Sequence, residues 1–171
     1  MFRFLASAAA LALTIASPCY AKDKAPSMSF DPYRKTGMLT GQSHWHNALL
    51  DLDKWQWYFQ MAIVNGEARN PVLVFSADVE DWHFFNKAAD IDGQELHVIQ
   101  GDRSLLGLGS GVSETVAVEV TPDYIRRHRS TGMNIKIMGS RGDKVVIIPA
   151  DAVEAFANGA IIEFTKLAAI R

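Results

Sequence analysis

Cysteine is almost absent from this sequence, because Cys19 is the only one among 171 residues. If the leader described below is removed, the remaining chain has no thiol nucleophile, no cysteine ligand for a metal and no disulfide. Its stability must then come from side-chain packing. The sequence also lacks, beyond the leader, any apolar run approaching the roughly 20 residues that cross a bilayer.

The first 21 residues have the pattern of a secretory signal peptide. Arg3 supplies the positive charge, residues 5–16 form the apolar core, and small residues precede a predicted cut between Ala21 and Lys22. Acylation of Cys19 is disfavoured, because a proline stands before it where lipoprotein signals carry a small residue. The sequence therefore predicts a periplasmic or secreted protein.

Length and charge predict one ordinary domain without a general affinity for polyanions. Removal of the leader leaves 150 residues, with 16 basic against 19 acidic side chains and a net charge near −3. This balance gives no overall attraction to nucleic acid or to an anionic membrane. Residues 22–43 mix Lys, Pro, Ser, Gly and Asp without a sustained period, which predicts a flexible lead-in. The domain is expected over residues 44–171.

Alternating apolar residues predict about seven strands. In the clearest run, from Trp55 to Ile63, large apolar side chains occupy every second position. Because the connections are short, the sheets should be antiparallel and form a sandwich or a curled sheet. The other expected strands cover 72–77, 82–88, 96–100, 116–120, 133–137 and 144–148.

Two short helices are expected near the C-terminus. Thr121 can cap a helix whose first residue is proline, and Gly132 can end it in the left-handed conformation. The second helix is expected over Ala150–Ala157, with Asn158-Gly159 as its stop and residues 160–171 as a further edge strand. The predicted fold class is mainly β, a β-rich α+β domain.

His44 and His46 are the strongest candidates for metal ligands, because residues two apart on an extended chain face the same side. Asp51 and Asp53 are potential oxygen ligands nearby. A zinc or copper site, however, needs three or four ligands fixed by further hydrogen bonds, and the pattern shows no such convergence. The favoured interpretation is a surface segment, and no cofactor is predicted.

Several short motifs resemble known sites but lack the residues that complete them. Gly107–Gly111 has alternating glycines, yet no helix follows to meet a phosphate, and Ser110 lacks the spacing of a hydrolase nucleophile. Residues 90–93 resemble half of a calcium loop without its closing Glu. Arg141-Gly142-Asp143 spells an integrin-binding tripeptide but is ordinary hairpin chemistry.

Acidic and aromatic side chains suggest an alternative function on carbohydrate. Asp78, Glu80 and Asp81 form an acidic cluster, and two carboxylates about 5–10 Å apart across a cleft act on glycosidic bonds. Most of the clustered aromatics are expected in the core because they alternate strictly. Tyr58 with one tryptophan is the alternative, an exposed platform for a sugar ring or an apolar partner.

A run of basic residues is the candidate for an anion or partner face. It lies at the end of the first predicted helix, where cations also offset the negative end of the helix dipole. Its expected ligands are lipopolysaccharide, phospholipid or an acidic polymer. The face comprises Arg126, Arg127, Arg129 and Arg141, with Arg103 and Lys144 as further members.

A set of turn, core and cap residues carries a resemblance to known proteins. They are Trp82–Phe85, Ala88, Asp92-Gly93, Leu96, Asp102-Arg103, Glu114, Tyr124-Ile125, Gly132, Ile135–Ile137, Gly139–Gly142, Val145-Val146, Pro149 and Val153–Phe156. In these residues the chain resembles a broad group of small secreted or lipid-anchored bacterial envelope proteins without an established activity. The resemblance implies an envelope location and a β-rich fold. Some members carry cysteines in the loop matching Gly107–Gly111, and this chain has none there, so no disulfide role transfers.

The sequence therefore predicts a non-enzymatic binding or accessory module of the periplasmic envelope. Its expected partner is an envelope protein or polymer and not a nucleic acid. The alternative is a small-ligand binder or hydrolase acting on envelope carbohydrate through Asp78, Glu80 or Asp81.

Overall fold

The computed structural model describes residues 25–46, 54–107 and 111–169, which form two antiparallel sheets and two helices. The helices are α1 (Pro122–His128) and α2 (Ala150–Ala169). The strands are β1 (Ser27–Asp31), β2 (Thr36–Thr40), β3 (His44–His46), β4 (Lys54–Val64), β5 (Glu67–Ala68), β6 (Val72–Val79), β7 (Lys87–Asp90), β8 (Glu95–Leu96), β9 (Val98–Leu105), β10 (Val112–Glu119), β11 (Met133–Gly139) and β12 (Gly142–Ile148).

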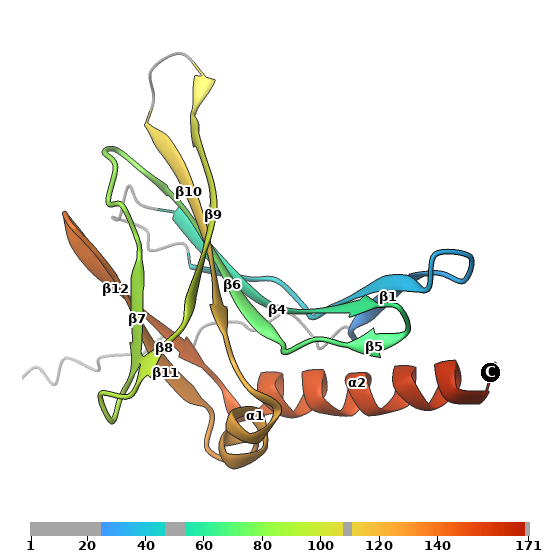
Figure 1. Ribbon diagram of the computed structural model, residues 1–171. Helices are drawn as coiled ribbons and strands as arrows, with labels where there is room; N and C mark the ends of the chain where they lie inside the picture. The colour runs from blue at the N-terminus through green and yellow to red at the C-terminus, as the bar shows by residue number, and fades with distance from the viewer. Residues whose placement is uncertain (1–24, 47–53, 108–110, 170–171) are drawn as a thin grey trace, which may run out of the picture.

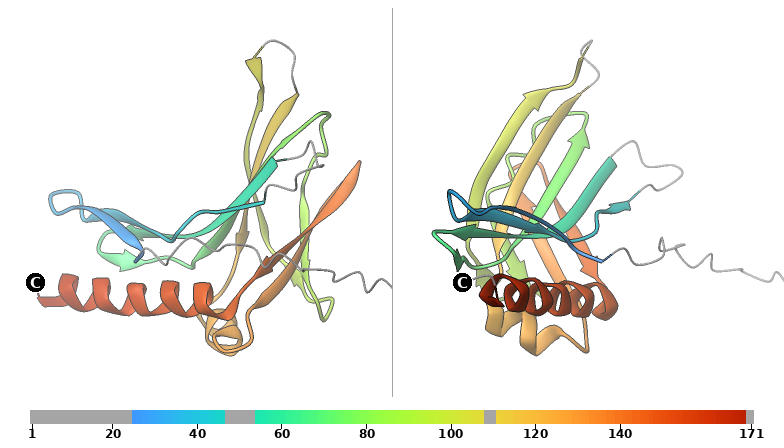
Figure 2. Two further views of the ribbon diagram at one scale, coloured as in Figure 1. Left: turned by 180° about the vertical axis from the view of Figure 1, so that it is seen from behind. Right: turned by 90° about the vertical axis from the view of Figure 1, so that its right-hand side faces the viewer.

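The larger sheet has the order β1-β2-β4-β6-β10-β9, with β3 and β5 paired to the two ends of β4. The smaller sheet has the order β12-β11-β7-β8. The large sheet bends strongly, so that the small sheet covers one part of its inner face and α2 runs along the other (Figures 1 and 2). Neither sheet is closed. The predicted fold class, a β-rich α+β domain with antiparallel sheets, is confirmed.

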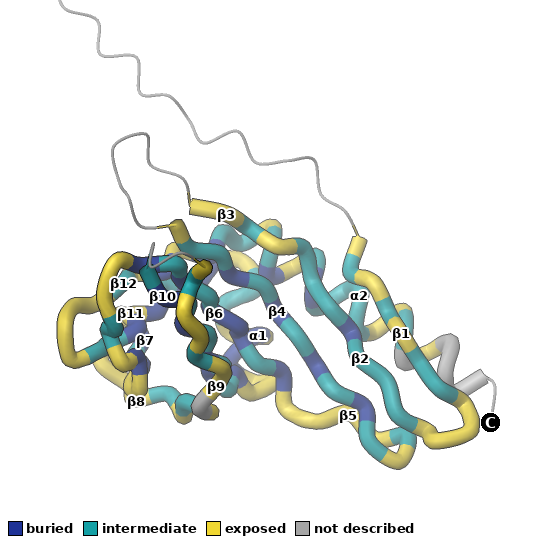
Figure 3. The backbone as a smooth tube through the Cα atoms, turned by 90° about the horizontal axis from the view of Figure 1, so that it is seen from above, coloured by how far each residue is buried: buried dark blue, intermediate teal, exposed yellow. Residues whose placement is uncertain are grey.

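One continuous core lies between the two sheets and α2. Along β4 the inward residues Trp57, Phe59, Met61 and Ile63 are all at most 5 % exposed, and partly exposed residues alternate with them. The same alternation is visible along neighbouring strands (Figure 3). Phe156 of α2 stacks on Phe59, with 5.0 Å between ring centroids, and thereby fixes the helix against the sheet. Aromatic side chains of this size bury large apolar areas, which explains the strict period of two in β4.

The prediction of a flexible lead-in over residues 22–43 is wrong for β1 and β2, which pair with each other and extend the large sheet. Leu39 of β2 is fully buried. The turn between them is held by the Asp31 carboxylate, which accepts hydrogen bonds from the backbone N–H of Tyr33 and Arg34. Each of these strands has only five residues, and serine, threonine and glycine occupy several of them. Apolar residues therefore alternate with polar ones over too few positions to give a clear strand signal.

The second helix is longer than predicted, because α2 continues through Asn158-Gly159 to Ala169. Gly159 does not end the helix. A side chain there would place its Cβ 2.6 Å from Cγ of Pro26, so the glycine allows the chain before β1 to cross the helix closely. The extended run expected over 82–88 is also shorter, since the strand begins only at Lys87.

The first helix and the following hairpin agree with the sequence prediction. The Thr121 side chain accepts a hydrogen bond from the Tyr124 N–H at 3.2 Å, and Pro122 is the first residue of α1. Gly132 has a φ of 76°, the left-handed conformation expected after a helix. β11 and β12 pair along their whole length across the Ser140-Arg141 turn.

Candidate functional site

A groove of about 690 Å³ lies between the two helices and the large sheet, and we call it the helix–sheet groove. Its apolar wall is formed by Met61 of β4, Ile125 of α1, and Phe156, Ala157, Ala160 and Ile161 of α2. α2 runs beneath β4 and β5 with α1 at its start, and all four elements border the groove (Figure 1). Its volume falls within the ~300–1,000 Å³ typical of ligand sites.

Three arginines also line the helix–sheet groove: Arg69 from the connection between β5 and β6, Arg126 from α1, and Arg129, the residue that caps the end of α1. No acidic side chain is among the described residues that line it. Arg126 and Arg129 are three residues apart and Arg129 keeps a helical backbone conformation, which places the two on one side of the helix. The groove is therefore an apolar channel with a cationic margin.

Two of these arginines make ion pairs with side chains outside the groove. Arg126 pairs with Asp123 one turn earlier in α1, and both side chains are more than 70 % exposed. Arg129 donates hydrogen bonds to Glu154 Oε1 at 3.0 Å and to Asn158 Oδ1 at 2.6 Å, and thereby joins α1 to α2. Exposed pairs of this kind contribute only about 0–1 kcal/mol, so they compete weakly with a ligand.

The other members of the predicted anion face lie elsewhere. Arg127 projects over the ring of Tyr124, with 5.6 Å from its guanidinium carbon to the ring centroid. Arg141, on the turn between β11 and β12, pairs with Asp81 at 2.9 Å. Arg103 pairs with the buried Glu114 of β10. The sequence did not identify Arg69 as part of a basic face, because it is a single cation in a turn. Its proximity to α1 depends on contacts between segments that are distant in the sequence.

The acidic cluster does not converge on the groove. Asp78 lies on the uncovered face of the large sheet, since it alternates with the buried Ala77 and Val79. Asp81 instead points to the small sheet, where it pairs with Arg141. None of the described pockets is lined by Asp78, Glu80 or Asp81.

His44 and His46 do face the same side, but each stacks on a tryptophan of β4. The ring centroids of His44 and Trp57 are 4.1 Å apart, and those of His46 and Trp55 are 4.5 Å apart. Within the described residues no three potential ligands gather at a metal-binding distance. Asp51 and Asp53 lie outside the described part of the chain.

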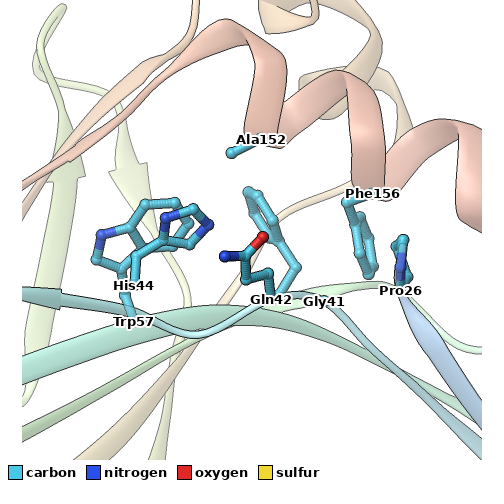
Figure 4. A pocket seen from close by; sticks show the side chains of 8 residues that line it. Pro26, Gly41, Gln42, His44, Trp57, Ala152 and Phe156 are labelled. Carbon is cyan, nitrogen blue, oxygen red and sulfur yellow. The ribbon is translucent and has the colours of Figure 1, made fainter. Parts of the chain in front are cut away.

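A small crevice lies beside His44 under the start of α2 (Figure 4). Its volume is about 10 Å³, room for at most a single water. Ala152 and Phe156 approach it from the helix, and Trp57 and His44 from the sheet (Figure 4). This crevice marks close packing of α2 on the sheet and is too small for a ligand.

A third cavity, of about 300 Å³, lies at the end of the small sheet beside Tyr124 and His128. The Tyr124 hydroxyl donates a 3.4 Å hydrogen bond to Oδ2 of Asp90, which is itself buried. Burial raises the pKa of Tyr124 to about 12, and the negative charge of Asp90 acts in the same direction. This phenol therefore remains neutral at physiological pH and acts as a hydrogen-bond donor.

The short motifs are engaged in packing or lie outside the described residues. In Arg141-Gly142-Asp143 both charged side chains are paired, Arg141 with Asp81 and Asp143 with Lys136 at 2.8 Å. Residues 90–93 form the turn between β7 and β8, in which Asp90 Oδ1 accepts the N–H of Gln94. Residues 108–110, including Ser110, are outside the described part.

Comparisons with known protein families, with curated proteins and with solved structures give no match to this chain. The resemblance to small envelope proteins stays a prediction. Among the described residues, neither helix combines the length and apolar character needed to cross a membrane. The helix–sheet groove is the largest cavity described, and it carries the functional argument.

Proposed function

We propose that this protein is a binding module of the bacterial envelope that holds an apolar chain in the helix–sheet groove. The observation that carries the proposal is the groove itself, about 690 Å³ of space beneath an otherwise packed sheet. Its α2 wall includes Ile161, which is 61 % exposed although it faces apolar neighbours. A ligand that covers an exposed isoleucine beside an apolar channel is stabilised by about 25 cal/mol for each Å² of apolar surface removed from water.

The predicted leader supports the envelope location, and the groove supports binding without catalysis. The side chains around the groove are apolar residues, arginines, an asparagine and a threonine, and such a set supplies recognition and no general base. The alternative, a hydrolase acting on carbohydrate, has less support, because Asp78 lies on the uncovered face of the large sheet whereas the Asp81 carboxylate is paired with Arg141. A glycosidase needs its two carboxylates across one cleft.

Filling the groove tests this function. N-phenyl-1-naphthylamine, a neutral apolar fluorophore, should bind the purified protein at one site and be displaced by 1-dodecanol. Ala160→Trp places a large ring in the groove, because Ala160 lines it, and should weaken binding at least tenfold. Ile162→Trp is the matched control: Ile162 is exposed on the same helix but does not line the groove, so binding should be unchanged.

Thermal unfolding of both variants checks that the fold is retained. Absence of saturable binding by the wild-type protein would overturn the proposed function. So would equal binding by wild-type protein and a folded Ala160→Trp variant, since the probe would then sit elsewhere.

A further inference from the structure

We infer that the apolar chain bound in the helix–sheet groove carries an acidic head group, a carboxylate or a phosphate monoester, bound by Arg69, Arg126 and Arg129. This inference rests on the proposed function and specifies its ligand as a single-chain anionic amphiphile. The arginines line the same groove as Met61, Phe156 and Ile161. A ligand with one charged end and one apolar end matches both kinds of wall.

The chain segments that carry the three arginines are joined on the side of the groove that faces α1. The Val120 N–H, just before α1, donates to the Pro71 carbonyl at 2.9 Å. Asn70 donates to Glu119 Oε1 at 2.5 Å, close to the same junction. These bonds hold the segment that contains Arg69 against the start of α1. Arg129 is tied to the first half of α2 through Glu154 and Asn158, so the cations lie toward α1.

Along α2 the groove is lined by apolar side chains as far as Ile161. Phe156 and Ala160 are four residues apart on α2, as are Ala157 and Ile161, so both pairs form one continuous side of the helix. Thr165 lines the groove one turn beyond Ile161. The positions of these residues give the ligand a direction, with its head beside α1 and its tail along α2 toward the C-terminus.

The charges at the groove favour an anion. Arg69 has no carboxylate partner among the described residues. The bonds from Arg129 to Glu154 and Asn158 use one terminal nitrogen, and a guanidinium has five N–H donors in a planar fork suited to a carboxylate or phosphate. Helix-dipole compensation alone accounts for cations near the end of α1. It does not account for Arg69, which lies in the connection between β5 and β6.

Calorimetry with matched ligands separates the head group from the tail. Dodecanoate and 1-dodecanol have the same chain length and differ in charge, and inorganic phosphate supplies charge without a tail. We expect dodecanoate to bind at least tenfold more tightly than dodecanol, a difference of about 1.4 kcal/mol. The preference for dodecanoate over dodecanol should become smaller as NaCl is raised from 0.05 to 0.5 M, because salt screens exposed charges. Dodecyl phosphate should bind at least as tightly as dodecanoate.

Arginine variants identify the cations involved. Arg69→Gln and Arg126→Gln should each reduce the preference for dodecanoate over dodecanol by about threefold to tenfold and leave dodecanol binding unchanged. Arg127→Gln is the matched control, since Arg127 stands next to Arg126 on α1 but projects over Tyr124 and not into the groove. The control should keep the full preference.

The outcomes separate the two proposals. Equal affinity for dodecanoate and dodecanol would overturn the acidic head group and leave the apolar binding function standing. Binding of neither ligand would overturn both. Binding of inorganic phosphate as tightly as dodecanoate would show an anion site without a tail and would also overturn the proposed function. If Arg127→Gln reduced the preference for dodecanoate as much as Arg69→Gln and Arg126→Gln do, the assignment of the acidic head group to the groove arginines would be overturned.

Discussion

Glu114 of β10 and Arg103 of β9 face each other across neighbouring strands, with 3.3 Å between Oε2 of the carboxylate and Nε of the guanidinium. The Glu114 side chain is fully buried. Its carboxylate also accepts the backbone N–H groups of three consecutive residues, His83, Phe84 and Phe85. Those residues cross from the large sheet to the small one, so a single buried carboxylate fixes the junction between the sheets.

We expect Glu114→Gln to lower the free energy of unfolding by about 3 kcal/mol, because the neutral amide no longer offsets the Arg103 charge and leaves at least one backbone N–H without an acceptor. The substitution keeps the side-chain volume, so the loss reports charge and hydrogen bonding. Urea unfolding followed by tryptophan fluorescence measures it. Glu95→Gln is the control, since Glu95 is exposed on β8 and should change stability by less than about 0.5 kcal/mol.

A cost below about 1 kcal/mol for Glu114→Gln would contradict this interpretation. It would mean that the crossover is held mainly by its other contacts. Those include the 2.7 Å hydrogen bond that the Ser140 N–H donates to the His83 carbonyl and the ion pair of Asp81 with Arg141.

Phe84, whose N–H is one of the three bound by Glu114, has a φ of 54°, in the left-handed region. Such a conformation costs a non-glycine residue about 1–2 kcal/mol. Phe84→Gly and Phe84→Ala both remove the ring and its contact with Arg103, so the comparison isolates the backbone. We expect the glycine variant to be more stable than the alanine variant by about 1 kcal/mol.

The matched control is the exposed Val145 in the extended strand β12. There the order should reverse, with Val145→Ala more stable than Val145→Gly, because glycine weakens a strand. Both pairs are compared by thermal unfolding. An alanine variant at position 84 that equals or exceeds the glycine variant would show that the backbone relaxes once the ring is removed.

Strong local signals in the sequence were sufficient to predict the main elements. β4 was predictable because Trp57, Phe59 and Met61 alternate strictly, and α1 because Thr121 and Pro122 cap it in the expected way. β1 and β2 were missed because they are short and because their serine, threonine and glycine residues weaken the apolar alternation. The length of α2 was misjudged because Gly159 has the local signature of a helix stop, whereas its role is tertiary, the close passage of Pro26.

The candidate site was only partly predictable for the same reason. The sequence identified Arg126 and Arg129 as basic residues at the end of a helix. It did not show that these two line the groove while Arg127 does not, because that depends on which side of α1 faces α2. Arg69 comes from the connection between β5 and β6, and long-range bonds such as that from the Val120 N–H to the Pro71 carbonyl bring its segment to α1. The groove exists because α2 continues past Asn158, which no local pattern indicated.

The pKa of Tyr124, raised to about 12 mainly by burial and then by Asp90, predicts a loss of stability in alkali. The phenol of Tyr124 binds its proton more tightly in the folded state than in the unfolded state, where its pKa is near 10. This contribution is therefore complete below pH 10 and is lost as the pH rises from about 10 to about 12. Urea unfolding at a series of pH values should show a steeper decline for the wild-type protein than for Tyr124→Phe.

Absorbance at 295 nm measures the ionisation of tyrosine. The difference in absorbance between the wild-type protein and Tyr124→Phe should show a titration near pH 12, which identifies Tyr124. Asp90→Asn retains the Oδ1 acceptor used by the Asp92 and Gln94 N–H groups but removes the charge beside the phenol. In this variant the pKa of Tyr124 should fall toward its ordinary value without reaching it, because burial persists. A Tyr124 titration near pH 10 in the wild-type protein would contradict both the buried phenol and its bond to Asp90.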